Sequence, residues 1–128
     1  MRLVVFLGAL SGALAVALGA FAAHGLSGTI PASDLAAFET GARYHLVHAL
    51  AMVAAGLLAA HGGGRAAVAG GLAFLLGTVL FSGSLYVLGL TGSRALVLVT
   101  PVGGVAFVLG WILVAVAALG ANRLRGRG

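Results

Sequence analysis

Long runs of sequence without a charged side chain constrain the fold of this chain more than any other feature. Residues 3 to 23 contain no acidic or basic residue, and 62% of all residues are hydrophobic whereas 7% are charged. Soluble domains have roughly 45–50% apolar residues, so this chain has too little polar sequence to cover a water-exposed surface. Because about 20 helical residues cross a hydrocarbon core of roughly 30 Å, the sequence predicts one all-α membrane domain.

Turn-forming residues divide the apolar sequence into four predicted spans. Glycine and arginine interrupt it at 61–65 and again at 91–94, and Thr100-Pro101 reads as an N-cap followed by proline at the first helical position. The predicted spans are residues 3–23, 42–60, 66–90 and 101–119, with a basic tail at 120–128. The fold class is therefore a four-helix transmembrane bundle.

A polar segment separates the first two predicted spans. Ser33 could cap a helix that begins at Asp34, and this helix would continue toward the second span. The sequence thus predicts an extra polar helical segment between spans 1 and 2.

Small residues in the first span predict close helix packing. Gly8 and Gly12 form a G-x-x-x-G step, and Ser11, Ala15 and Gly19 form a second ridge at four-residue spacing. On the predicted fourth span, Trp111 lies deeper than an interfacial residue, so we expect its indole N–H to bond to a neighbouring helix.

The arginines predict the orientation in the membrane. Five of the seven lie at the N-terminus, in the 61–65 turn and in the tail, whereas only Arg43 and Arg94 lie on the opposite side. The positive-inside rule therefore predicts a multi-pass protein of the bacterial inner membrane with both termini cytoplasmic. The basic tail suits anionic lipid headgroups, and the lack of interleaved aromatic residues argues against nucleic acid as a partner. A cleaved signal peptide is the alternative reading of the first span, although its apolar run is longer than a signal core.

A polar cluster beside the second span is the candidate functional site. Its members are His24, Glu39, Arg43, Tyr44, His45 and His48. On one continuous helix, Glu39 and Arg43 would pair four residues apart, and so would Tyr44 and His48. The structural reading is that the charges neutralise each other while the other side chains hydrogen-bond to neighbouring helices.

Two active readings of the cluster remain open. His24, His45 and His48, with Glu39, are weak candidates for metal ligands, because imidazole and carboxylate suit zinc, copper or iron but the H-E-x-x-H spacing is absent. The other reading is a proton or ion relay through Glu39 and the histidines. Secondary polar candidates in the later spans are Ser82, Ser84, Tyr86 and Thr100.

Four motifs carry a family resemblance. These are Gly19-Ala-Phe-Ala-Ala-His24-Gly-Leu26, Glu39-Thr-Gly-Ala-Arg-Tyr-His45 with His48-Ala-Leu50, Leu80-Phe-Ser-Gly-Ser-Leu-Tyr86 and Thr100-Pro-Val-Gly-Gly104. The chain resembles the small bacterial membrane family catalogued as domain of unknown function 423, which is similar to a small eukaryotic transmembrane group. The resemblance implies a four-span inner-membrane protein and supplies no activity.

The sequence favours a binding role over catalysis. We expect a non-enzymatic multi-pass protein without a cofactor, whose outward-facing polar cluster binds a partner, a lipid headgroup or a small ligand. The bilayer is its expected partner, and a protein or a second copy of the chain could also bind. A metal-dependent membrane enzyme and a small transporter or channel are the alternatives. The scheme of small multidrug transporters is excluded, because the first span has no acidic residue.

Overall fold

The computed structural model describes residues 1–125 and contains helices without strands in that part. The helices are α1 (Arg2–Phe21), α2 (Ala32–Leu58), α3 (Gly64–Gly77), α4 (Gly83–Thr91) and α5 (Val99–Arg125). Three segments of this part are long and apolar enough to cross a membrane, namely Arg2–Leu26, Ala32–Thr91 and Val99–Ala121. The all-helical membrane class is thus confirmed. Side chains are described as far as Ala121, so those of Arg123, Arg125 and Arg127 lie outside the described part.

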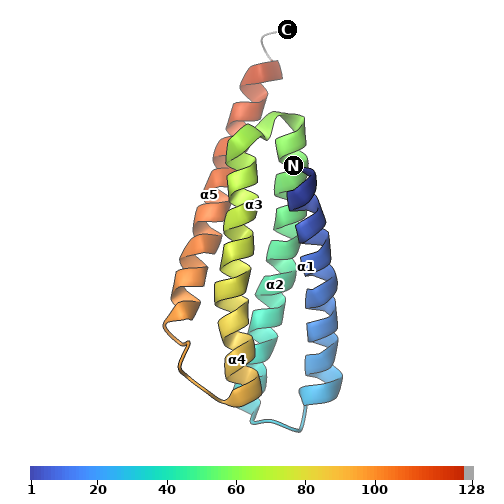
Figure 1. The fold of residues 1–128 in the computed structure, drawn as a ribbon, viewed down its shortest axis with the longest axis vertical. Helices are drawn as coiled ribbons and strands as arrows, with labels where there is room; N and C mark the ends of the chain where they lie inside the picture. Colours follow the sequence, from blue (N-terminus) through green and yellow to red (C-terminus); the bar gives the residue numbers. More distant parts are fainter. Residues whose placement is uncertain (126–128) are drawn as a thin grey trace.

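The middle apolar segment is folded back on itself at its centre. His61 has φ −105° and ψ 26°, and Gly62 has φ +102°, which is a left-handed backbone conformation that side-chain-bearing residues rarely adopt. The helical path therefore reverses here, and α2 and α3 run side by side in opposite directions (Figure 1). The turn that the sequence placed at 61–65 is confirmed.

α3 and α4 form one continuous rod. They are joined by a π-helical turn at Thr78–Ser82, whose flanking residues keep right-handed helical φ and ψ. The rod ends where Gly92 adopts φ +68° and its N–H bonds to the carbonyl of Leu88. The helix pair thus spans the molecule from Gly64 to Thr91.

The rods form an open bundle. α1 packs along α2, α2 packs against α3 and α4, and α5 packs along α3. α1 and α5 share no contact within the described residues, so the two outermost rods do not close the bundle (Figure 1). Each inner rod therefore has a neighbouring rod on two sides.

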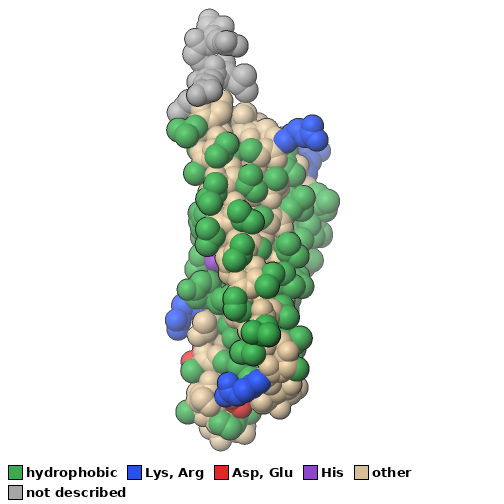
Figure 2. All heavy atoms as spheres, turned by 90° about the vertical axis from the view of Figure 1, so that its left-hand side faces the viewer, with side chains coloured by type: hydrophobic (Ala, Val, Ile, Leu, Met, Phe, Trp, Pro, Cys, Tyr) green, Lys and Arg blue, Asp and Glu red, His purple; other side chains and the backbone are tan. Residues whose placement is uncertain are grey.

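The outer surface is apolar over most of its length. Large side chains such as Phe6, Leu50, Leu98 and Leu119 are more than half exposed. Figure 2 shows hydrophobic side chains covering the band between the arginines near the two ends of the molecule. The small fully buried core includes Met52 and Phe74, so lipid must solvate most of the apolar side chains.

Two predicted helix starts differ from the structure. α2 begins at Ala32, and no side chain caps it, because the N–H groups of Asp34 and Leu35 both bond to the carbonyl of Pro31. The predicted cap at Ser33 is therefore wrong, and the polar segment forms the first turns of α2. α5 begins at Val99, so Thr100 lies inside the helix and not at its N-cap.

Close packing of α1 on α2 depends on one of the two glycines of the G-x-x-x-G step. A Cβ atom at Gly8 would lie 2.9 Å from Met52 Cβ and 2.9 Å from the backbone nitrogen of Val53, whereas at Gly12 it would lie 3.8 Å from Ala49 Cβ. A Cβ atom at Gly8 would therefore overlap both Met52 Cβ and the Val53 backbone nitrogen, whereas a Cβ atom at Gly12 would make an ordinary contact. The same sequence motif thus contains one essential and one replaceable glycine.

We expect Gly8→Ala to destabilise the protein by about 1–3 kcal/mol, because α1 must move away from α2. Gly12→Ala is the matched control, and it should leave stability unchanged or raise it slightly, since alanine favours the helix. Unfolding in mixed micelles with an increasing fraction of denaturing detergent measures both. Equal stability of the two variants would contradict the packing that the structure shows.

Candidate functional site

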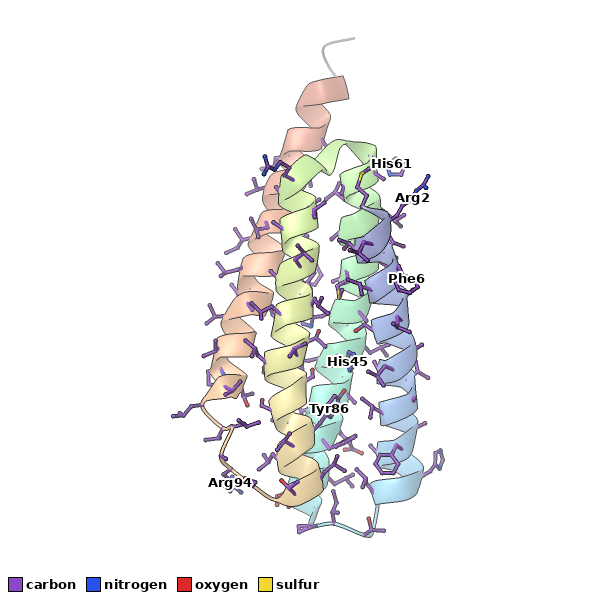
Figure 3. All side chains as sticks on the ribbon, viewed as in Figure 1. Arg2, Phe6, His45, His61, Tyr86 and Arg94 are labelled. Atoms are coloured by element: carbon purple, nitrogen blue, oxygen red, sulfur yellow. The ribbon has the colours of Figure 1, made fainter. Side chains whose placement is uncertain are left out.

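His45 connects three helices through its two ring nitrogens. Its Nε2 atom lies 2.9 Å from Ser11 Oγ of α1, and its Nδ1 atom lies 2.8 Å from the Tyr86 hydroxyl of α4. Figure 3 shows His45 and Tyr86 pointing toward one another between α2 and α4. Because each hydroxyl can either donate or accept, both neutral tautomers of His45 keep two hydrogen bonds. The chain Ser11–His45–Tyr86 can therefore reverse the direction of its hydrogen bonds without breaking them.

His48 lies one helical turn further along α2 and has fixed partners. Its Nδ1 is 2.7 Å from the carbonyl oxygen of Tyr44, and Trp111 of α5 donates its indole N–H to Nε2 at 3.2 Å. A carbonyl can only accept and an indole N–H can only donate, so His48 carries its proton on Nδ1 and is neutral. Protonation of Nε2 would place two N–H donors against each other. This bond confirms the prediction that Trp111 bonds to a neighbouring helix.

Aromatic rings surround His48. Its ring stacks on Phe107 with centroids 3.5 Å apart and an interplanar angle of 8°, and on Tyr44 with centroids 6.0 Å apart. Phe74 and Trp111 meet edge to face at 5.0 Å on the same side. The predicted four-residue pairing of Tyr44 with His48 is thus present, and side chains fill the groove between α2 and α5.

Both histidines lie at the middle of the rods and not at an end. His45 is 4% exposed and bonds to Ser11, which is halfway along the 20-residue α1. In a membrane this depth offers no water, so the polar ring atoms must find partners within the protein. The hydrogen bonds described above supply those partners.

The six residues of the predicted cluster do not meet at one site. His45 and His48 are buried, whereas the other four are exposed, namely His24, Glu39, Arg43 and Tyr44. No ion pair forms between Glu39 and Arg43 or between any other side chains described up to residue 121. The predicted Glu39–Arg43 pairing is therefore absent from the described side chains.

The secondary polar candidates also do not form one site. Tyr86 joins His45, whereas Ser84 donates to the carbonyl of Phe81 at 2.8 Å and lies 2.6 Å from the Thr100 hydroxyl. Ser82 is fully buried, and its hydroxyl has no hydrogen-bond partner. Ser84 and Thr100 thus hold α4 to α5 and lie apart from the histidines.

Two hydroxyl residues near the histidines were not among the sequence-predicted site residues. Ser11 was interpreted as a packing residue, although it bonds to His45. Thr78 is 7% exposed, and its buried hydroxyl has no partner. The sequence feature that could have identified both residues is a hydroxyl side chain in the middle of an apolar run, since such groups bond across helices in membranes.

The histidines do not form a metal site with the acids. In the part of the chain that the structure describes, no group of three His, Asp or Glu side chains has a metal-binding arrangement. Both ring nitrogens of His45 and His48 are already engaged by hydroxyl, carbonyl and indole groups. The residues that the metal reading needs are therefore not brought together.

Fold and site define an integral membrane protein with uncharged, hydrogen-bonded histidines inside an apolar helical bundle. Comparison with known proteins agrees with this class. The family model described as "Protein of unknown function (DUF423)" matches residues 18–104, and the chain belongs to this family.

Curated relatives cover nearly the whole chain. The UPF0382 membrane protein YwdK of Bacillus subtilis is 48% identical over 121 residues, which are 93% of this chain and 98% of the relative. The UPF0382 inner membrane protein YgdD of Escherichia coli is 42% identical over 122 residues, covering 95% and 93%. The UPF0382 membrane protein SAB0533 of Staphylococcus aureus is 42% identical over 117 residues, covering 91% and 95%. No solved structure matches the chain.

The bond between Trp111 and His48 predicts a measurable coupling between α5 and α2. In a double-mutant cycle with Trp111→Phe and His48→Phe, we expect a coupling energy of about 0.6–1.7 kcal/mol, the range of interhelical hydrogen bonds in membranes. Unfolding in mixed micelles supplies the four stabilities. Trp111→Phe combined with Thr40→Val is the control, and these effects should add. A coupling of zero for Trp111 and His48 would show that the bond does not contribute.

Proposed function

We propose that this protein is a four-span inner-membrane protein that binds an amphiphilic small molecule taken up from the bilayer. The observation that carries this proposal is a groove of about 730 Å³ beside His45. Ligand sites generally have volumes of about 300–1,000 Å³ and are mostly apolar with a few polar groups. This role is one of binding, without a catalytic step.

The four-span count rests on the reversal at His61 and Gly62. The segment Ala32–Thr91 has 60 residues, and two crossings of the hydrocarbon core need about 40, so it is long enough to cross twice. Its two arms, α2 and the α3–α4 rod, run antiparallel alongside α1 and α5. Each arm then crosses the membrane once, and the four crossings place both termini on one side.

The charge distribution supports cytoplasmic termini. Arg2 and the His61 turn lie at the same end of the molecule, and Arg94 lies at the other end (Figure 3). Gly62 is near Ala121 of α5, so the end of the last apolar segment also lies at the first of these ends. Five of the seven arginines belong to it by sequence, which favours the cytoplasm.

A topology assay tests this orientation. A green fluorescent protein fused after Gly128 should fluoresce, and alkaline phosphatase fused at the same position should be inactive. A phosphatase inserted between Gly92 and Ser93 should be active, because that loop would face the periplasm. The reverse pattern would overturn the proposed orientation.

The groove lies between α1 and the α3–α4 rod, with α2 as its floor. Its apolar wall residues are Leu7, Leu10, Ala13 and Leu14 from α1 and Leu75, Val79 and Gly83 from the opposite rod or its π turn. Ser11, His45, Thr78 and Tyr86 supply its polar groups. The groove therefore combines an apolar wall suited to a hydrocarbon chain with polar groups suited to a small head.

The space between α2 and α5 differs from the groove beside His45. Between α2 and α5, the rings of His48, Phe107 and Trp111 pack together, as described above. Beside His45, by comparison, the groove between α1 and the α3–α4 rod is left open. Aromatic rings thus pack against His48, whereas an open groove adjoins His45.

The alternative roles have less support. A metal-dependent enzyme would need His24 and Glu39 beside the buried histidines, and both are exposed. A relay from Glu39 to His45 would need a polar path, whereas the partners of His45 are Ser11 and Tyr86. Binding in the groove uses the arrangement of polar groups as it stands.

Blocking the groove tests the proposal. Gly83 lines it, and a Cβ atom at this helical position meets no atom within 4 Å, so Gly83→Leu should fold and fill the groove. The probe is a long-chain methyl ketone with a photoreactive diazirine in its chain. We expect it to label wild-type residues Leu10, Leu14 and Val79, and we expect Gly83→Leu to lose this labelling.

Gly19→Leu is the matched control. Gly19 is also helical with no atom within 4 Å of an added Cβ, but it does not line the groove. Labelling should persist in this variant. Both variants should be at least as stable to unfolding in mixed micelles as the wild type, because leucine favours a helix more than glycine does. Uniform labelling of the lipid-facing surface, unchanged by Gly83→Leu, would overturn the binding role.

A further inference from the structure

We infer that the groove selects an uncharged long-chain carbonyl compound and that Thr78 donates a hydrogen bond to its carbonyl oxygen. This inference rests on the proposed binding role and names the ligand class. It depends on the charge of the groove, on one unpartnered hydroxyl and on the local helix geometry at that residue.

The groove lacks the groups that a charged head would require. None of the residues lining it is Asp, Glu or Arg, and its polar members are two hydroxyl residues, a histidine and a tyrosine. An ion without a counterion at this depth would lose its hydration and gain too little in exchange. A phosphate or carboxylate headgroup is therefore disfavoured, and an uncharged head is selected.

Among the residues whose side chains the structure describes, Thr78 is the one threonine whose hydroxyl makes no hydrogen bond. Helical threonines usually bond back to a carbonyl four residues earlier. Thr40 and Thr91 do so at 2.9 and 2.6 Å, Thr29 bonds to Leu26 at 2.8 Å, and Thr100 lies 2.6 Å from Ser84 Oγ. The Thr78 oxygen is buried without a partner, and the residue lines the groove. A buried hydroxyl without a partner is unfavourable, and a hydrogen bond to a ligand oxygen removes this penalty.

The π turn places Thr78 and Gly83 together on the groove wall. The Gly83 N–H bonds to the carbonyl of Thr78, five residues earlier, where an α-helix would bond four residues earlier. In an α-helix, residues five apart point about 140° away from each other. The wider π turn brings both to one face, and π turns of this kind are frequent at functional sites. A Cβ atom added at Gly83 would meet no atom within 4 Å, so the groove wall is open at this position.

The other polar groups of the groove determine which kind of head fits. Ser11, His45 and Tyr86 satisfy one another in a chain of two hydrogen bonds. The remaining unused polar atom is the Thr78 hydroxyl, whose hydrogen needs an acceptor. A ketone, ester or quinone-type carbonyl oxygen provides an acceptor without a charge and without a donor that would itself need a partner.

Two probes of equal chain length separate this inference from the general binding role. One is the long-chain methyl ketone, and the other is the hydrocarbon with a methylene group in place of the carbonyl. Affinities for the protein in nanodiscs should favour the ketone by roughly three- to tenfold, as expected for one hydrogen bond. In Thr78→Val, which keeps the shape and removes the hydroxyl, this preference should vanish while hydrocarbon binding persists.

A carbonyl infrared band provides an independent readout. A ¹³C-labelled ketone should show a lower carbonyl frequency when bound to the wild type than in lipid, and the shift should be lost in Thr78→Val. Thr40→Val, which alters a threonine outside the groove, should retain both the preference and the shift. Equal binding of both probes to the wild type, or a shift that persists in Thr78→Val, would overturn the inference. If neither probe binds in a manner sensitive to Gly83→Leu, the binding role itself fails.

Discussion

The structure depends on two histidines of α2 whose side chains bond to helices on different sides. His45 bonds from α2 to α1 and α4, and His48 receives a bond from Trp111 of α5. Lipid provides no hydrophobic force between helices and no water for polar groups, so specific bonds and close backbone contacts must set the helix arrangement. Each ring nitrogen has a partner, which lets neutral imidazoles lie at the middle of apolar rods.

The two histidines differ in how freely they can change. His48 is fixed in one neutral tautomer between a carbonyl and an indole N–H, and Phe107 stacks on its ring. His45 has hydroxyl groups on both sides and keeps its hydrogen bonds in either tautomer. The rigid histidine lies in the filled groove, and the adaptable one forms the floor of the open groove.

Much of the architecture could be predicted because lipid imposes simple rules on sequence. The charge-free run at 3–23 and the glycines near Gly62 determine where the chain crosses the apolar layer and where it reverses. The hydrogen bond from Trp111 could be predicted, because its indole N–H lies too deep in the predicted span to reach the membrane interface. Helix starts were less predictable, because α2 begins at Ala32 and α5 at Val99, each one residue before the expected cap at Ser33 or Thr100. Contacts between distant residues, such as Ser11 with His45, have no local sequence signature.

The sequence by itself determined that the chain is helical and membrane-embedded, and it identified Tyr44, His45 and His48 as unusual polar residues, because charge and hydropathy act residue by residue. Only the tertiary structure decided that these histidines lie at mid-depth, apart from Glu39 and Arg43, and that Thr78 is left without a partner. The physical reason is rotation about the helix axis. Neighbours in sequence such as Arg43 and His45 point to different environments, and packing against α1, α4 and α5 determines which side chains turn inward.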